Sequence, residues 1–210
     1  MKLKKYRREV ALFMNRLYLR GLTTVSGGNI SLFAENKWVC ITPSATDKAN
    51  IHEKQICVFT LNGKKIKELG KASIETSMHM AIYRHNPNVL AIIHAHPVFA
   101  SCFAAMNKTL NGKLIAEARA IIGEPAYVPY APMGSEELAG LVAQASRQSG
   151  VLILRNHGVL ATGKSLLQAF DRVEVLENAA KMSFITETLN DKRELTSDQL
   201  SQIDLWVKSL

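Results

Sequence analysis

The sequence contains few cysteines and no long uninterrupted hydrophobic segment. Its three cysteines are an odd number and stand far apart in apolar surroundings, at Cys40, Cys57 and Cys102. This pattern argues against a disulfide framework and against a zinc site built from thiolates, and it favours small buried side chains. Because no apolar stretch is long enough to span a bilayer, we expect no membrane partner.

A secretory leader is not indicated either. The chain begins Met1-Lys2-Leu3-Lys4-Lys5 and continues into an amphipathic pattern instead of the apolar core of a signal peptide. We therefore expect a cytoplasmic protein. With 210 residues and no internal repeat, low-complexity segment or linker, the sequence predicts one domain over residues 1–210 with a sizeable core.

The balance of charge is basic, which raises the question of nucleic acid. Lysine and arginine number 26 against 18 acidic residues, a formal net charge of +8. The basic residues are dispersed, and neither an aromatic platform nor a recognition helix accompanies them. We predict no nucleic-acid partner, since an anionic small substrate would suit the same balance.

Hydrophobic periodicity predicts helices interspersed with short strands. The expected helices run from Tyr6 to Leu17, from Ser73 to Asn86, over 98–105, over 135–149, from Ser165 onward and from Ser197 toward Trp206. The expected strands cover 30–33, 39–42, 56–61, a stretch near Ile66, 90–93, 127–130, 151–154 and 159–162. Ser73 is a candidate helix cap, and Ser165 with Gln168 is a candidate capping box.

Two apolar segments end at histidines. In Ile92-Ile93-His94-Ala95-His96 the histidines are two residues apart, so they project from one face if the segment is a strand. The second segment, 151–154, is followed closely by His157. Three imidazoles at strand ends predict a metal pocket, whereas the pair alone would also fit two unrelated polar residues in a loop.

A zinc site with three imidazoles is completed by a carboxylate, water or substrate. Glu75, at the start of a predicted helix, is the best carboxylate candidate. The same residue fits an ordinary first-turn glutamate, favoured by the helix dipole and paired with His79 one turn later. The residues alone leave both interpretations open.

Six short motifs occur in a specific order and spacing. They are Gly28-Asn29-Ile30-Ser31, Ile41-Thr42-Pro43-Ser44, Ser73-Ile74-Glu75 with Met78-His79, His94-Ala95-His96, Val128-Pro129-Tyr130-Ala131-Pro132, and Asn156-His157-Gly158. Through them the segment from Gly21 to Ala180 resembles the class II aldolase/adducin-head family, L-fuculose-phosphate aldolase type. The resemblance implies an α/β fold, a single three-layer α-β-α domain with a central mixed, largely antiparallel sheet, and a homotetramer.

The resemblance also implies roles for the matching residues. One zinc ion would be bound by Glu75, His94, His96 and His157. Glu75 would double as the catalytic acid/base, with His79 as hydrogen-bonding support. The phosphate of a sugar substrate would be bound by Ser26, Gly28, Asn29, Ser44 and Ser73. Two residues depart from the family pattern, because Ala45 replaces a frequent glycine and Ile74 replaces a serine.

The proton donor of related aldolases has no counterpart in this sequence. Those enzymes use a tyrosine of a neighbouring subunit in the segment that aligns with 114–119, where this chain has no tyrosine. Tyr127, Tyr130 and Glu117 are candidate replacements.

The expected activity is zinc-dependent cleavage of a ketose 1-phosphate to dihydroxyacetone phosphate and a short aldehyde. Other divalent metals also suit such ligands. Alternatives on the same fold are a methylthioribulose-1-phosphate dehydratase and a sugar-phosphate epimerase, although epimerases usually carry aspartate in place of Glu75. A non-catalytic adducin-like interaction module is a further alternative, and it would predict lost metal ligands.

Overall fold

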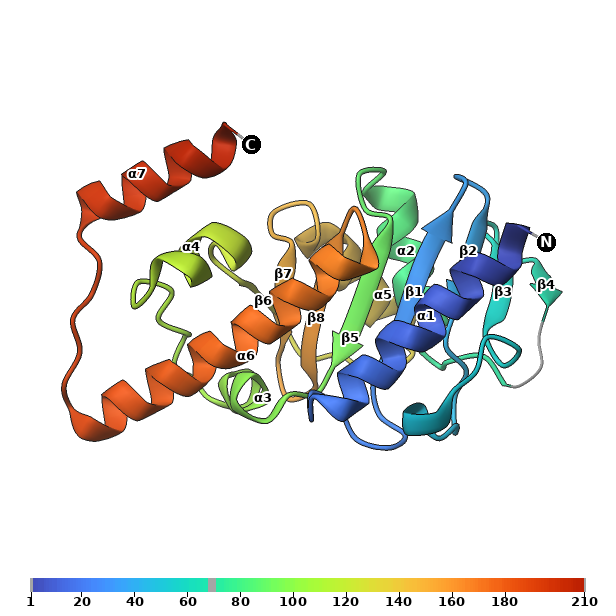
Figure 1. Ribbon diagram of the computed structural model, residues 1–210, viewed down its shortest axis with the longest axis horizontal. Helices are drawn as coiled ribbons and strands as arrows, with labels where there is room; N and C mark the ends of the chain where they lie inside the picture. Colours follow the sequence, from blue (N-terminus) through green and yellow to red (C-terminus); the bar gives the residue numbers. More distant parts are fainter. Residues whose placement is uncertain (1, 68–70, 210) are drawn as a thin grey trace.

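The computed structural model describes residues 2–67 and 71–209 (Figure 1). The described helices are α1 (Lys2–Leu19), α2 (Thr76–His85), α3 (Val98–Ala105), α4 (Ala116–Ile122), α5 (Glu136–Ala145), α6 (Leu166–Leu189) and α7 (Ser197–Lys208), with a 3-10 turn, η1, at Lys48–Asn50. The described strands are β1 (Asn29–Ala34), β2 (Trp38–Ile41), β3 (Cys57–Thr60), β4 (Lys65–Lys67), β5 (Ala91–Ala95), β6 (Ala126–Val128), β7 (Val151–Leu154) and β8 (Gly158–Gly163).

These strands form one sheet in the order β4-β3-β2-β1-β5-β8-β7-β6. Every neighbouring pair is antiparallel except β6 and β7, which are parallel. The expectation of a mixed, largely antiparallel sheet is therefore confirmed. The central strand β5 pairs with β1 on one side and β8 on the other, which brings segments distant in sequence to one end of the sheet.

Helices cover both faces of the sheet, so the predicted three layers are confirmed (Figure 1). Helices α1, α3 and α6 pack on one face, and α2 and α5 on the other. Strand β5 shows how the sequence produces this: Ile93 joins the core under α1 and α6, whereas Ile92 joins the core under α2 and α5. Side chains of a strand alternate between faces, and β5 is buried on both.

The sequence did not predict α4. This helix has only seven residues, no side-chain cap at Ile115, and ends at Gly123 with a φ of 59°. A contact with another helix stabilises α4, because Arg119 donates to both carboxylate oxygens of Asp204 on α7 at 2.7 and 2.6 Å. None of the described helices has the length and apolar character needed to cross a bilayer.

Two cap predictions need correction. Ser73 does not cap α2, because the helix begins at Thr76 and the Ser73 hydroxyl instead accepts from the backbone N–H of Glu75 at 3.3 Å. The Ser165 hydroxyl does cap α6, accepting from the backbone N–H of Gln168 at 3.2 Å. The Gln168 side chain, however, accepts from Lys164 instead of Ser165, so only half of the capping box forms.

Ala45 adopts a left-handed backbone conformation with a φ of 49°. An L side chain in this region costs about 1–2 kcal/mol, while a glycine loses about 0.4–1 kcal/mol through greater freedom of the unfolded chain. We therefore predict that Ala45→Gly raises the free energy of unfolding by about 0.5–1 kcal/mol. Urea denaturation measures the change, with Ala120→Gly in α4 as a control that should lower stability. A less stable Ala45→Gly protein would contradict the prediction.

Candidate metal centre

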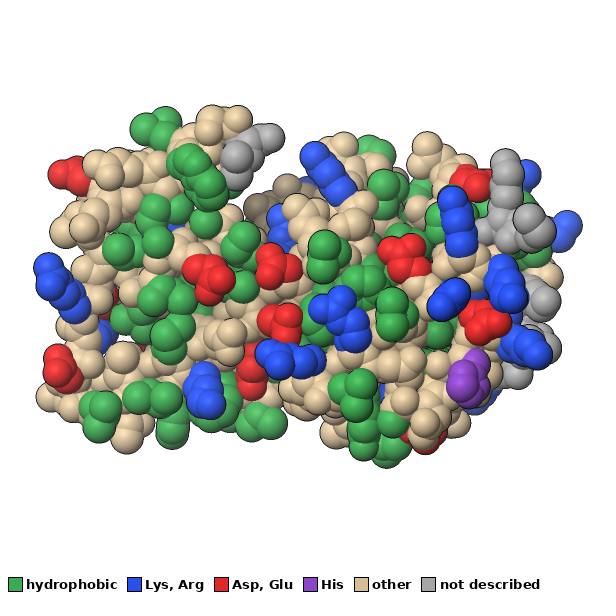
Figure 2. Space-filling model, in the orientation of Figure 1, with side chains coloured by type: hydrophobic (Ala, Val, Ile, Leu, Met, Phe, Trp, Pro, Cys, Tyr) green, Lys and Arg blue, Asp and Glu red, His purple; other side chains and the backbone are tan. Residues whose placement is uncertain are grey.

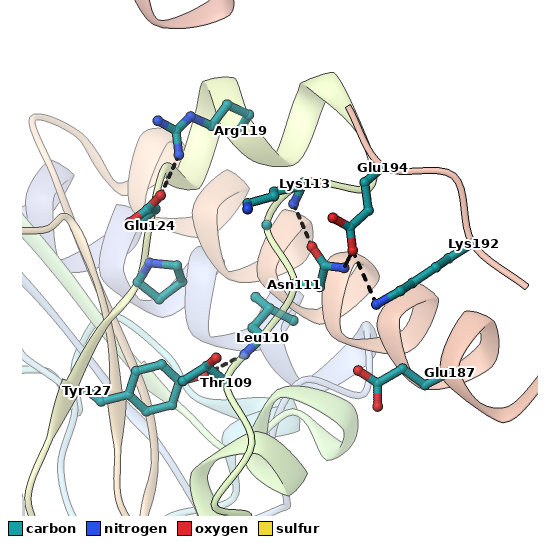
Figure 3. Close-up of a pocket in the computed structure, with 12 residues that line it drawn as sticks. Thr109, Leu110, Asn111, Lys113, Arg119, Glu124, Tyr127, Glu187, Lys192 and Glu194 are labelled. Atoms are coloured by element: carbon teal, nitrogen blue, oxygen red, sulfur yellow. Dashed lines mark hydrogen bonds and ion pairs between the residues drawn. The ribbon is translucent and has the colours of Figure 1, made fainter. Parts of the chain in front are cut away.

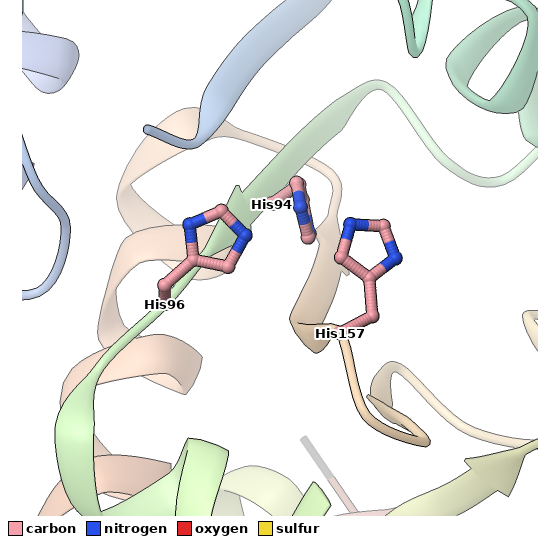
Figure 4. Close-up of side chains that lie close together, drawn as sticks. All are labelled: His94, His96 and His157. Carbon is pink, nitrogen blue, oxygen red and sulfur yellow. The ribbon is translucent and has the colours of Figure 1, made fainter. Parts of the chain in front are cut away.

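Three histidines meet where the ends of β5 and β8 adjoin (Figure 4). One ligand nitrogen from each of His94, His96 and His157 lies within 4.8 Å of the others. The ring centroids of His94 are 4.7 Å from those of both His96 and His157. The prediction that the two strand-end segments bring their histidines together is confirmed.

The surroundings of His94 determine which of its ring nitrogens carries the proton. The residue is fully buried, and its Nδ1 donates to the carbonyl oxygen of Val159 at 2.9 Å. A neutral imidazole carries a single N–H, so Nε2 keeps its lone pair and can bind a cation. Burial lowers the pKa of His94 to about 3, which keeps the ring neutral near pH 7.

Glu75 lies against two of these histidines. Its Oε2 is 3.3 Å from His94 Nε2, and its Oε1 is 3.0 Å from His157 Nε2. It is not part of the mutually close set of three. Burial alone would raise the pKa of this carboxyl group, but His94, His157 and Asn29 outweigh burial and hold the pKa below its usual value. The site therefore places one carboxylate anion beside the neutral ring of His94.

The donor set fits a metal ion on two observations. Within the part of the chain that the structure describes, the buried atoms without a hydrogen-bond partner include His94 Nε2, Glu75 Oε1 and both ring nitrogens of His157. Buried polar atoms are rarely left without a partner, and one cation would engage the His94 nitrogen, the Glu75 oxygen and one nitrogen of His157 together. Bonds of about 2.0–2.1 Å in a tetrahedral zinc site also separate neighbouring ligand atoms by about 3.3 Å, close to the spacings of Glu75 from the two histidines.

Two glycines permit this close approach. A Cβ on Gly28, whose φ is 64°, would lie 2.8 Å from the carbonyl oxygen of His94. A Cβ on Gly158 would lie 2.5 Å from the His96 ring and 2.7 Å from the carbonyl oxygen of Ala95. Gly28 thus has a packing role besides the phosphate binding that the resemblance implies for it.

Helix α3 lies between the segment that carries His96 and the segment that carries His157. Side chains from other elements form hydrogen bonds with both of its ends. The Glu177 carboxylate accepts from the N–H groups of Phe99 and Ala100 at 3.0 and 2.8 Å, at the positive end of the helix. Arg155 donates to the carbonyl oxygens of Phe103 and Met106 at its negative end. His96 precedes this helix and His157 follows Arg155, so both ties fix metal-site segments. No sequence pattern identified Glu177 or Arg155.

The residues predicted to bind phosphate fall into two groups. Ser44 and Ser73 are brought near each other, since the Ser44 hydroxyl donates to the Ala72 carbonyl oxygen at 2.9 Å. Ser26 is exposed on the loop that leads to Gly28. Asn29 is instead buried, and its amide donates to Glu75 Oε2 at 2.6 Å and accepts from His79 at 2.6 Å. Asn29 therefore contacts the acid/base candidate directly.

Buried groups around these residues were missed or only partly anticipated. The predicted support by His79 is confirmed through its hydrogen bond to Asn29. Ser31 and Tyr83, which extend that contact, were not singled out. Lys48 is 1% exposed, and its ammonium group donates to the carbonyl oxygen of Pro43 at 2.6 Å, under the loop that carries Ser44. Helical and strand spacing could have revealed Ser31 and Tyr83.

Of the candidate proton donors, Tyr127 has a structural role. Its hydroxyl accepts from the N–H of Leu110 at 2.8 Å, and Arg155 lies over its ring. Tyr127 lines a separate cavity of about 530 Å³ near α4 and the end of α6 (Figure 3). Among the described residues, none of the three histidines lines that cavity. Tyr130 and Glu117 are exposed.

Gly158→Ala tests the packing of the histidine cluster. The added methyl group must displace His96 or the backbone at Ala95, so we predict weaker metal binding and a loss of about 1–3 kcal/mol in stability. Metal content after dialysis and thermal unfolding measure both effects. Gly140→Ala is the matched control, because its Cβ would meet nothing within 4 Å and alanine favours the helix. Unchanged metal retention in Gly158→Ala would contradict the prediction.

Comparison with known proteins gives consistent matches. The family described as class II aldolase and adducin N-terminal domain matches residues 8–184. An L-fuculose phosphate aldolase from Methanococcus vannielii is 37% identical over 185 residues, covering 88% of this chain and 97% of the relative. A solved structure of an L-fuculose 1-phosphate aldolase is 30% identical with a TM-score of 0.89, covering 97% of this chain and 96% of its own.

More distant relatives carry other names. A 5-deoxy-D-ribulose 1-phosphate aldolase from Bacillus thuringiensis is 28% identical and covers 97% of this chain and 95% of the relative. A 3-oxo-tetronate 4-phosphate decarboxylase from Escherichia coli is 27% identical and covers 94% of each chain.

Proposed function

Because the chain belongs to the class II aldolase and adducin N-terminal domain family and is a lyase of that type, we propose that it cleaves a ketose 1-phosphate to dihydroxyacetone phosphate and a short aldehyde. The carrying observation is the buried carboxylate of Glu75 against the histidine cluster. A set of imidazoles and a carboxylate without cysteine is typical of catalytic metal sites.

We assign the metal ligands to His94, His96 and His157, with Glu75 beside them, and propose zinc as the ion. When bound, the ion supplies a Lewis acid that stabilises negative charge on substrate oxygens. His94 is oriented for this role by its bond to Val159, and His96 and His157 by the ties of α3. The chain retains the metal-ligating side chains that a non-catalytic, adducin-like module would be expected to have lost.

Glu75 is the proposed acid/base. In the cleavage direction the C3–C4 bond of the ketose breaks, the electron pair stays on C3, and the hydroxyl proton on C4 passes to solvent as the aldehyde forms. The Glu75 carboxylate takes up a proton from solvent and delivers it to C3, and in the synthetic direction it removes that proton from C3 and returns it to solvent. Among the described residues its Oε1 has no hydrogen-bond partner, and this oxygen lies 3.0 Å from His157 Nε2, inside the site.

A phosphorylated sugar is the proposed substrate class. The names of the aldolase relatives support a ketose 1-phosphate. Ser26, Gly28, Ser44 and Ser73 are proposed to bind the phosphate, together with backbone N–H groups of the glycine loop. Asn29 is proposed to act on Glu75 as well, because its amide contacts that carboxylate. Ile74 is 56% exposed and offers an apolar contact in place of a hydroxyl.

Decarboxylation is a second candidate. The similarity to the 3-oxo-tetronate 4-phosphate decarboxylase supports it, because the match extends over nearly the whole of both chains. This reaction also leaves an electron pair on carbon that needs a proton, so Glu75 would have the same task. Release of carbon dioxide instead of an aldehyde distinguishes the two reactions.

Glu75→Gln tests the proposal. The zinc-loaded protein should condense dihydroxyacetone phosphate with one or more short aldehydes, and Glu75→Gln should lower kcat by about 10²–10⁴-fold because the amide cannot accept the proton. Product formation is followed by chromatography. Glu137→Gln, at an exposed glutamate in the first turn of α5, is the control. Undiminished condensation by Glu75→Gln would rule out the acid/base role.

We also propose that the chain assembles as a homotetramer. Figure 2 shows hydrophobic groups at the surface near the C-terminal part of the chain. The large apolar side chains that remain exposed on α6 and α7 include Phe184, Leu189, Leu205 and Trp206. Exposed apolar patches of this kind mark association surfaces. Light scattering coupled to size exclusion should give four times the chain mass, and a mass of one chain would contradict the proposal.

A further inference from the structure

A buried chain of hydrogen bonds leads from Glu75 away from the histidine cluster. Asn29 Nδ2 donates to Glu75 Oε2 at 2.6 Å, and Asn29 Oδ1 lies 2.6 Å from His79 Nε2. His79 Nδ1 lies 2.6 Å from the Ser31 hydroxyl, which lies 2.7 Å from the Tyr83 hydroxyl. Each link is short, and together they connect Glu75 to a phenol near the opposite end of α2.

Two periodicities build this chain. Asn29 and Ser31 are two residues apart on β1 and face α2, while His79 and Tyr83 are four apart on α2 and face β1. His79 and Ser31 are fully buried, and Tyr83 and Asn29 are 3% and 4% exposed. No member can exchange its partner for water without opening the packing between α2 and the sheet.

The charge on Glu75 sets the direction of every bond. A carboxylate only accepts, so Asn29 must present its NH₂ to Glu75 and its carbonyl oxygen to His79. His79 must then carry its proton on Nε2, which leaves Nδ1 to accept from Ser31. Burial keeps His79 neutral by lowering its pKa to about 4, so a single N–H is available.

The last link completes the direction. The Tyr83 hydroxyl has one proton and two neighbours, the Ser31 hydroxyl at 2.7 Å and the Leu90 carbonyl oxygen at 3.5 Å. The shorter contact is the stronger bond, so Tyr83 donates to Ser31. All donors then point toward Glu75, and aligned bonds of this kind strengthen one another in a buried setting.

We propose that His79, Ser31 and Tyr83 are positioning residues for Glu75: their one-way hydrogen-bond chain holds the Asn29 amide against Oε2 and so fixes the orientation of the carboxylate. The catalytic half of this inference rests on the proposed function, whereas the direction of the chain does not. The opposite direction would need the proton of His79 on Nδ1 and an inverted Asn29 amide.

The first experiment reads the proton on His79 directly. The protein is labelled with ¹⁵N-histidine, and two-bond correlations between ring nitrogens and ring protons identify the tautomer of each of its six histidines. The His79 signal is assigned by its absence in His79→Gln. The proposal expects the Nε2–H tautomer, and an Nδ1–H tautomer would overturn it.

The second experiment measures catalysis. His79→Leu removes the donor to Asn29 and should lower kcat by roughly 10–100-fold with little change in KM, because a hydrogen bond serving a charged group is lost. His79→Gln retains a donor at the Nε2 position and should recover kcat to within about threefold of wild type. Equal losses in both variants would overturn the positioning role.

Two substitutions that remove a single oxygen atom test the proposal even if the His79 variants fail to fold. Tyr83→Phe and Ser31→Ala each remove one oxygen and should lower kcat by about 2–10-fold. Ser183→Ala is the matched control, since Ser183 is fully buried on α6 and its hydroxyl has no hydrogen-bond partner among the described residues. A wild-type kcat in Tyr83→Phe and Ser31→Ala, or an equal loss in Ser183→Ala, would contradict the proposal.

The two experiments separate this inference from the proposed function. A wild-type protein that shows the Nε2–H tautomer but neither condenses aldehydes nor releases carbon dioxide would refute the proposed function and still support the directed chain. An active protein with the Nδ1–H tautomer would do the reverse.

Discussion

The burial of a single negative charge at Glu75 governs the arrangement around it. A carboxylate removed from water is costly unless other groups replace its hydration. Here Asn29 donates to the carboxylate on one side, and a cation held by the histidine cluster would balance its charge on the other. The orientation of Asn29 then imposes an order on the polar groups behind it, so the packing between α2 and β1 is specific instead of merely apolar.

The sheet makes this arrangement possible because β5 lies at its centre. Antiparallel pairing with β1 and β8 sets Asn29 opposite His94 and places the 156–158 turn beside the end of β5. Groups that are more than sixty residues apart in sequence therefore share one small volume. The apolar cores on both faces hold β5 in place, and the site depends on them for its distances.

Much of this arrangement could be predicted from the sequence, and the limits have physical causes. The two-residue spacing of His94 and His96 and the apolar segment before His157 are local signals, and they predicted the cluster. Helix α4 escaped because its stability comes from Arg119 and Asp204, a contact between distant elements. The prediction that Ser73 caps α2 was wrong, because its hydroxyl accepts from the N–H of Glu75, the residue before the helix begins.

Other features depend on partners that no local pattern reveals. Asn29 was expected to bind phosphate, and only the folded chain shows its amide divided between Glu75 and His79. The single domain over residues 1–210, the cytoplasmic location and the absence of a nucleic-acid partner stay predictions. The family match begins at residue 8, somewhat earlier than the Gly21 expected from the motifs.

The eight-residue helix α3 has a consequence for how the protein selects an ion. Glu177 and Arg155 tie its two ends, so the segments bearing His96 and His157 cannot move apart independently. A flexible site adapts its donors to the ion, whereas a rigid one imposes its own spacing and coordination number. Discrimination between divalent ions would then depend on two side chains that never touch the metal.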